Sequence, residues 1–168
     1  YLDLAYQLAE QNLGKTGLNP SVGAIVVKND SVISSGVTSF RGRPHAEFNA
    51  LFKLKNCAGA SLYTSLEPCV HFGKTPPCTK IISKKRIKKV YFGSYDPDIR
   101  SFKKARSFLT KKGIDVKKIK TKNYKNFYKS YFINKKLFSS KVFSINKSAL
   151  FFHFWSKLFF VCKLFSLS

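Results

Sequence analysis

A histidine and two cysteines in the first half of the chain are spaced as the ligands of a zinc ion could be. His45 opens a predicted helix, Cys69 follows a predicted strand, and Cys78 opens the next predicted helix. One imidazole and two thiolates make three ligands, which leaves a fourth position open for water, as a catalytic zinc site requires. Zn²⁺ lowers the pKa of such a water to about 7. These residues therefore predict a catalytic zinc centre.

Glu47, two residues after His45, is placed to carry protons beside that centre without being a ligand. A structural zinc site is the alternative, and it would need a fourth ligand. His71, between the two cysteines, could supply one. A purely structural site has no use for Glu47, so the catalytic interpretation is preferred.

The order H-x-E, then P-C, then C is typical of zinc nucleobase deaminases. Four longer stretches resemble the deaminase domain of the bifunctional deaminase–reductase family of riboflavin biosynthesis. The resemblance covers roughly residues 1–120 and implies a three-layer α/β/α cytidine deaminase-like domain with a central mixed sheet. The stretches are NPSVGAIVVKND, GRPHAEFNAL, GASLYTSLEPCVHFGKTPPCTKIISKKRIKKVYFGSYDPD and KKGIDV.

The resemblance also implies an activity. It is the zinc-dependent hydrolytic deamination of 2,5-diamino-6-(5-phosphoribosylamino)pyrimidin-4-one to 5-amino-6-(5-phosphoribosylamino)uracil, with release of ammonia. The family pattern implies that His45, Cys69 and Cys78 hold Zn²⁺ and that Glu47 is the proton carrier. It implies substrate contacts by Asn19, His71, Lys74 and Asp96.

The loop EPCVHFGKTPPC is longer than the Pro-Cys-x-x-Cys of most zinc deaminases, and the resemblance makes it a substrate loop between two zinc ligands. Lys74 suits a phosphate because an ammonium group acts as a compact point charge. The chain departs from the family after Asp96-Pro97, where a stretch that usually contains glycine reads Asp98-Ile-Arg-Ser-Phe102. The edge of the substrate pocket is the region that this departure affects.

Helices and strands are predicted to alternate, which is typical of a layered α/β domain. Apolar residues at helical spacing predict helices at 2–13, 45–55, about 78–85 and 102–112. Short apolar runs predict strands at 22–28, 31–37, 61–65, 87–93 and 114–119, with Asn29-Asp30 as the turn of a hairpin between the first two.

Three segments are expected along the chain. Residues 1–122 form the zinc-dependent deaminase domain, 123–148 are a linker-like remnant of the entry to a reductase domain, and 149–168 are an apolar tail of unknown structure. We expect the reductase half to be absent, because no Gly-rich dinucleotide fingerprint follows. Lys157 and Lys163 interrupt the tail, which argues against a membrane span.

The net charge of +23 is concentrated in the second half of the chain. Residues 1–79 carry 7 Lys+Arg and 5 Asp+Glu (+2), and residues 80–168 carry 24 and 3 (+21). Such a charge favours anionic partners, and a tRNA-type nucleic-acid base deaminase is one alternative function. A non-catalytic zinc-binding remnant is the other. We expect a small phosphorylated pyrimidine as the substrate, no specific nucleic acid, no membrane and a cytoplasmic location, and we allow for a homo-oligomer.

Overall fold

The structure, a computed structural model, describes residues 1–133 of the 168-residue chain. Residues Tyr1–Lys129 form one compact unit, which therefore includes the first residues of the segment 123–148. The expectations for the tail 149–168, and for all but the start of segment 123–148, lie outside the described residues.

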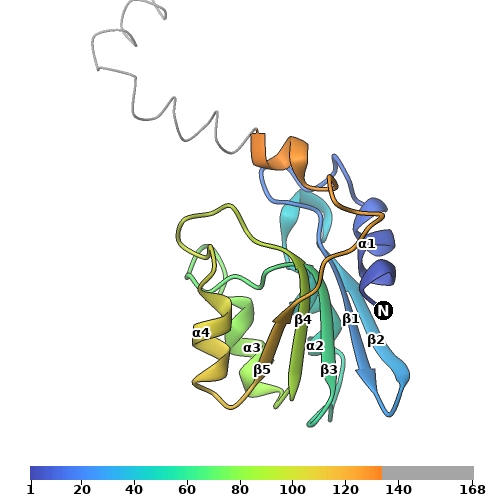
Figure 1. Cartoon of the computed structure of the whole chain (residues 1–168), viewed down its shortest axis with the longest axis vertical. Coiled ribbons are helices and arrows are strands. Elements are labelled where there is room, and N and C mark those ends of the chain that lie inside the picture. Colours follow the sequence, from blue (N-terminus) through green and yellow to red (C-terminus); the bar gives the residue numbers. More distant parts are fainter. Residues whose placement is uncertain (134–168) are drawn as a thin grey trace, which may run out of the picture. The chain divides into compact units, whose positions relative to one another are not determined.

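A mixed five-stranded sheet in the order β2-β1-β3-β4-β5 forms the centre of this unit (Figure 1). The pairs β1–β2 and β1–β3 are antiparallel, and the pairs β3–β4 and β4–β5 are parallel. The predicted elements are all found, with ends that differ by a few residues. They are α1 (Leu2–Glu10), β1 (Gly23–Lys28), β2 (Ser31–Val37), α2 (Ala46–Phe52), β3 (Ser61–Leu66), α3 (Cys78–Lys84), β4 (Lys89–Ser94), α4 (Ala105–Thr110) and β5 (Asp115–Lys118), with a short 3-10 helix at Phe40–Gly42.

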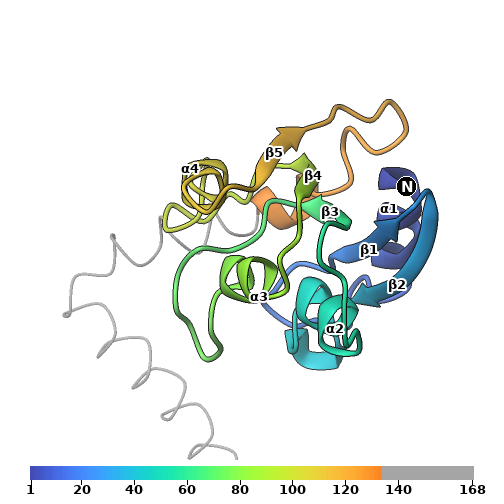
Figure 2. The same ribbon diagram turned by 90° about the horizontal axis from the view of Figure 1, so that it is seen from below.

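Helices cover both faces of the sheet, as a three-layer α/β/α domain requires. Helix α1 lies on one face, and α2, α3 and α4 lie on the other (Figure 2). Strands β1 and β3 at the centre bury Ala24, Val26 and Leu62 completely. The fold expected from the sequence is therefore confirmed.

The first two strands form the predicted hairpin. Asn29 and Asp30 have φ values of +49° and +56°. Two central residues with positive φ make the two-residue turn that suits the right-handed twist of paired strands, and Asn and Asp tolerate that conformation well.

Two glycines let helices approach the hairpin closely from opposite faces. A Cβ on Gly23 would lie 1.9 Å from the carbonyl oxygen of Ala5 in α1. A Cβ on Gly36 would lie 2.4 Å from the carbonyl oxygen of Ala46 in α2. Helix α2 thus packs directly against β2. This contact sets the distance between the sheet and the first turn of α2, where Glu47 lies, next to His45.

An aromatic cluster ties residues 124–128 to α1. The rings of Tyr6 and Tyr124 are stacked with centroids 4.5 Å apart, and Phe127 meets Tyr6 edge-on at 5.3 Å. The hydroxyl group of the buried Tyr128 lies 2.7 Å from Ser65 Oγ and donates to the carbonyl oxygen of Ser21. Tyr128 belongs to the domain core, and Tyr124 and Phe127 are half-buried beside it. Within residues 1–133, no helix combines the length and the apolarity that crossing a membrane requires.

Candidate metal centre and active site

The three predicted zinc ligands converge in the structure. His45 precedes α2, Cys69 follows β3 and Cys78 begins α3. The Nδ1 atom of His45 lies 3.7 Å from Cys69 Sγ and 3.4 Å from Cys78 Sγ. The three ligand atoms all lie within 4.8 Å of one another, close enough to share one ion.

Backbone hydrogen bonds hold the two cysteines together although eight residues separate them. The amide of Cys78 donates to Cys69 Sγ over 3.2 Å, and the amide of Thr79 donates to the carbonyl oxygen of Cys69. The side chain of Thr79 donates to the same carbonyl. The first turn of α3 is therefore fastened to the residue that leaves β3, and the loop 70–77 bulges out between them.

The electrostatics of the cluster favour a cation. Hydrogen bonds from Cys78 and His45 lower the pKa of Cys69 to about 4, so this sulfur is a thiolate at neutral pH. The pKa of Cys78 is raised, because it hydrogen-bonds to the Cys69 thiolate and is buried beside Glu47. The hydrogen bond to Cys69 also raises the pKa of His45. A divalent cation would favour the thiolate form of both cysteines, because cysteine ligands bind a metal in their deprotonated form.

Glu47 lies inside this cluster and not on the surface. Its side chain is 4% exposed, and its Oε2 lies 3.3 Å from Cys78 Sγ. Burial, followed by the charge of the Cys69 thiolate, raises its pKa to about 7. A carboxyl group with a pKa near 7 can both accept and donate a proton at neutral pH, which is the property of a general acid–base.

The donor set fits zinc. Two sulfurs and one imidazole nitrogen are ligands that Zn²⁺ prefers, and three protein ligands are the usual number in catalytic zinc sites. His71 does not complete a four-ligand structural site, because its Nδ1 is engaged 2.9 Å from Ser101 Oγ and it is outside the cluster of ligand atoms.

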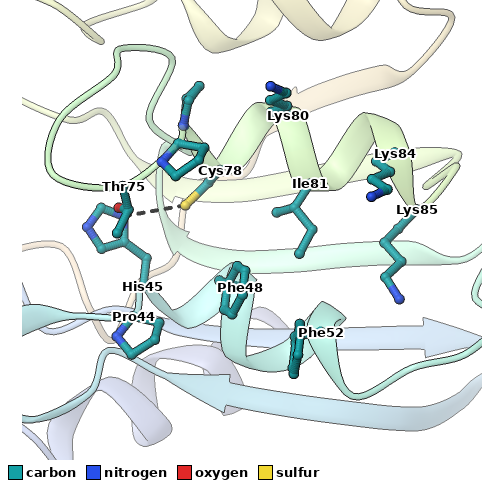
Figure 3. Close-up of a pocket in the computed structure, with 12 residues that line it drawn as sticks. Pro44, His45, Phe48, Phe52, Thr75, Cys78, Lys80, Ile81, Lys84 and Lys85 are labelled. Atoms are coloured by element: carbon teal, nitrogen blue, oxygen red, sulfur yellow. Dashed lines mark hydrogen bonds between the residues drawn. The ribbon is translucent and has the colours of Figure 1, made fainter.

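A groove of about 590 Å³ begins at His45 and Cys78, two of the candidate metal ligands, and runs between α2 and α3 (Figure 3). Phe48 and Phe52 of α2 are stacked with centroids 5.1 Å apart, and they face Ile81 of α3. Lys80, Lys84 and Lys85 also line the groove. The candidate metal centre thus lies at one end of an apolar groove that is also lined by lysine side chains.

The four residues expected to contact substrate occupy loops around the centre. Asn19 Nδ2 donates to the carbonyl oxygen of Gly42 over 3.1 Å and so supports the loop that leads to His45. His71 is fixed by Ser101, which also accepts a hydrogen bond from the amide of Val70. Their contacts with substrate stay predictions.

Asp96 and Lys74 differ in their surroundings. Asp96 is 8% exposed, and its Oδ1 accepts a hydrogen bond from the amide of Asp98. Lys74 is exposed in the loop between the cysteines. A surface ammonium group can meet a phosphate at little desolvation cost, whereas the buried Asp96 is held in one orientation.

Glu67 is a supporting residue that sequence analysis did not single out. Its side chain is 2% exposed and accepts hydrogen bonds from the backbone amides of Asp96, Lys103 and Ala105. It therefore holds the loop after β4 against the end of β3, two residues before Cys69. The signal available in the sequence was an acidic residue directly before Pro-Cys, just after a predicted strand.

Lys103, directly after the stretch Asp98–Phe102, forms a turn without a glycine. This residue has a φ of +58°, in the left-handed region that favours glycine. The hydrogen bond from its amide to Glu67, 3.0 Å long, holds the turn.

Arg43 and Thr75 are two more residues that sequence analysis missed. Arg43 Nη1 donates to Thr75 Oγ1 over 2.9 Å and lies 3.5 Å from His45 Nε2. Arginine and threonine are both common in loops, so the sequence carried no signal for either residue. Only the hydrogen bond between them indicates a role at the site.

Comparisons with known proteins agree with this site. The family described as "Cytidine and deoxycytidylate deaminase zinc-binding region" matches residues 1–94. A protein of Buchnera aphidicola subsp. Schizaphis graminum, named diaminohydroxyphosphoribosylamino-pyrimidine deaminase, is 37% identical over 134 residues, which cover 79% of this chain and 91% of that protein.

Longer relatives match over a part of their length. The riboflavin biosynthesis protein RibD of Aquifex aeolicus is 43% identical over 117 residues, 69% of this chain and 33% of the relative. The structure of Acinetobacter baumannii RibD has a TM-score of 0.67 and 38% identity, and covers 70% of this chain and 33% of that one. The chain therefore spans about a third of these RibD proteins.

Proposed function

The chain belongs to the zinc-binding cytidine and deoxycytidylate deaminase family, and on this premise we propose that it deaminates a phosphoribosylated diaminopyrimidine. The reaction is the hydrolysis of 2,5-diamino-6-(5-phosphoribosylamino)pyrimidin-4-one to 5-amino-6-(5-phosphoribosylamino)uracil and ammonia. It is a step of riboflavin biosynthesis, the process for which the RibD relatives are named.

One observation carries the proposal: a buried carboxyl group lies against a cluster of three zinc-type ligands. Glu47 Oε2 is 3.3 Å from Cys78 Sγ, and Cys78 Sγ is 3.4 Å from His45 Nδ1. The name of the Buchnera relative supports the substrate, since 91% of that protein is covered by the match. The loop between Cys69 and Cys78 supplies the extra residues that a phosphorylated substrate would need.

Zinc, when bound by His45, Cys69 and Cys78, supplies a Lewis acid that makes water a nucleophile near neutral pH. Glu47 accepts the proton of the attacking water at its carboxylate and delivers it to the ring nitrogen beside the amino-bearing carbon. It then takes the second proton from the hydroxyl group added to that carbon and delivers it to the amino group, so that the C–N bond breaks, ammonia leaves and the carbonyl of the uracil forms. Burial, the largest cause of the raised pKa of Glu47, favours transfer in both directions.

We assign the phosphate side of the substrate to the loop between the cysteines. Lys74 would meet the phosphate as a point charge, and His71 would stand beside it, oriented by Ser101. Asn19 and Asp96 would contact the pyrimidine side. The substrate is a free small molecule, so no base needs to be flipped out of a helix.

The location and partners are part of the same proposal. Within the described residues, Cys57, Cys69 and Cys78 are outside disulfide bonds, and a reducing compartment such as the cytoplasm would keep cysteines available as metal ligands. The enzyme would act without a nucleic-acid partner, as a monomer or a homo-oligomer.

Ammonia release by the zinc-loaded chain tests the proposal. We expect release from the phosphorylated diaminopyrimidine and none after chelation of zinc. The same preparation should be offered cytidine, dCMP and single-stranded RNA. Turnover of RNA with none of the pyrimidine nucleotide would instead support the nucleic-acid deaminase. A chain that retains zinc and turns over none of these would support the non-catalytic alternative.

A further inference from the structure

The middle of the loop between the cysteines makes few polar contacts, in one of which the Lys80 ammonium group lies 5.7 Å from the centroid of the Phe72 ring. Its first residues are fastened through Ser101, which meets Val70 and His71, and its last through the bonds of Cys78. Between these ends, residues 72–76 carry Lys74. Within the part of the chain that the structure describes, a single side-chain hydrogen bond joins 72–76 to the rest of the domain.

Arg43 donates that hydrogen bond, and its guanidinium group lies beside the loop. Nη1 of Arg43 donates to Thr75 Oγ1 over 2.9 Å. A Cβ built on Gly73 would be 3.7 Å from Arg43 Nη2, so the guanidinium passes beside the loop backbone at ordinary contact distance. Both Arg43 and Thr75 are half-buried, which limits competition by water.

The backbone on both sides of Arg43 is itself fixed. The carbonyl oxygen of Gly42 accepts a hydrogen bond from Asn19, and that of Pro44 accepts one from the amide of Ser39. The guanidinium also lies 3.5 Å from His45 Nε2, on the side of the ring away from the thiolates. Arg43 therefore links a rigid segment at the metal centre to a weakly held loop.

We propose that Arg43 is a positioning residue that clamps the loop 69–78 over the metal centre through Thr75, and so places Lys74 for the substrate phosphate. This inference rests on the proposed function for its kinetic consequence. The contact between Arg43 and the loop itself does not require substrate, so it can be tested in the zinc-loaded protein alone.

The test compares Arg43→Ala, Thr75→Val and the double variant with the unchanged chain. Each single variant should raise the KM for the phosphorylated pyrimidine about tenfold, as expected for one charged hydrogen bond, while kcat and zinc content change little. The double variant should match the single ones, because both remove one interaction. The KM for the dephosphorylated analogue should not move.

Arg43→Lys should recover much of the affinity, since an ammonium group can still donate to Thr75. Arg41→Ala is the matched control, because that guanidinium lies over the ring of Phe40 and not over the loop. Additive effects of the two substitutions, or loss of zinc in both single variants, would overturn the clamp.

Hydrogen exchange gives a readout that needs no substrate. The amide of Gly73 donates to the carbonyl oxygen of Thr75, and its exchange should be about tenfold faster in Arg43→Ala and Thr75→Val. Unchanged exchange would overturn the clamp even if the enzyme is active. Faster exchange in a protein that deaminates no pyrimidine nucleotide would confirm the clamp and contradict the proposed function.

Discussion

Glu47 shows how one residue acquires a chemical role from its surroundings. Its pKa is raised to about 7, first by burial and then by the Cys69 thiolate. The same glutamate on an exposed helix would be ionised and would hold no proton at neutral pH. The position two residues after a ligand places it at the centre, and burial makes it suitable for proton transfer.

Replacing Glu47 with glutamine should separate metal binding from catalysis. Glutamine keeps the shape but cannot carry a proton, so turnover should fall by about 10²–10⁴-fold or more, with zinc retained. Ammonia release and metal analysis of one preparation check this. Cys78→Ser is the companion variant and should lose both zinc and activity. Near-normal turnover in Glu47→Gln would show that another group carries the proton.

Lys103 allows a second test at the residue scale. Its φ of +58° costs free energy that glycine would not incur. The ammonium group also lies over the rings of Tyr95 and Phe102, so replacement removes those contacts as well. Lys103→Ala removes the same contacts and keeps the strain. We therefore expect Lys103→Gly to be more stable to unfolding than Lys103→Ala by about 1 kcal/mol. Equal urea midpoints would argue against strain at this turn.

At the scale of elements, loops between strands and helices build the site, and the sheet and helices hold them in place. The end of β3, the start of α2 and the start of α3 bring the ligands together. Glu67 at the end of β3 and Arg43 before α2 then hold the two loops that border the centre. The rigid elements position the metal ligands, and side chains between the loops position the proposed substrate contacts.

The segment after β5 matters for stability at this same scale. A chain ending at residue 122 loses the rings of Tyr124, Phe127 and Tyr128, which pack on or near Tyr6. A chain ending at residue 129 keeps them. We expect the shorter chain to be less stable by at least about 3 kcal/mol, the cost typical of losing one buried aromatic side chain. Equal free energies of unfolding in urea would show that the domain ends before the aromatic cluster.

At the scale of the whole molecule, the charge of residues 80–168 sets the conditions for any anionic partner. The +21 carried there would attract a phosphorylated nucleotide and RNA alike. The number of phosphates engaged distinguishes the two, because each phosphate contact with single strands adds about −0.7 to the log–log salt slope.

We therefore expect a shallow salt dependence of kcat/KM for the pyrimidine nucleotide, consistent with one phosphate. Lys74→Ala should raise the KM for this substrate and have little effect on a dephosphorylated analogue. RNA should bind weakly, without sequence preference, and should not inhibit at moderate salt. A steep slope for turnover, equivalent to several phosphates, would contradict the single-phosphate site.

The amino-acid sequence alone was enough to predict the helices, the strands and the residues of a candidate zinc centre. Hydrophobic periodicity located the helices and strands within a few residues, because burial of one face imposes a local repeat. The residue types of His45, Glu47, Cys69 and Cys78 indicated a metal and a proton carrier, since few other functions require that set in that order. The turn at Asn29-Asp30 was equally local.

The contacts between loops that lie far apart in the sequence could be read only from the three-dimensional structure. The bond between Arg43 and Thr75 joins residues 32 positions apart, and that between Ser65 and Tyr128 joins residues 63 apart. No local pattern encodes such contacts, because they depend on the order of strands in the sheet and on loop paths. The left-handed Lys103 is similar: its backbone amide bonds to the buried Glu67, 36 residues away, and this contact helps hold a conformation that a lysine alone would not favour.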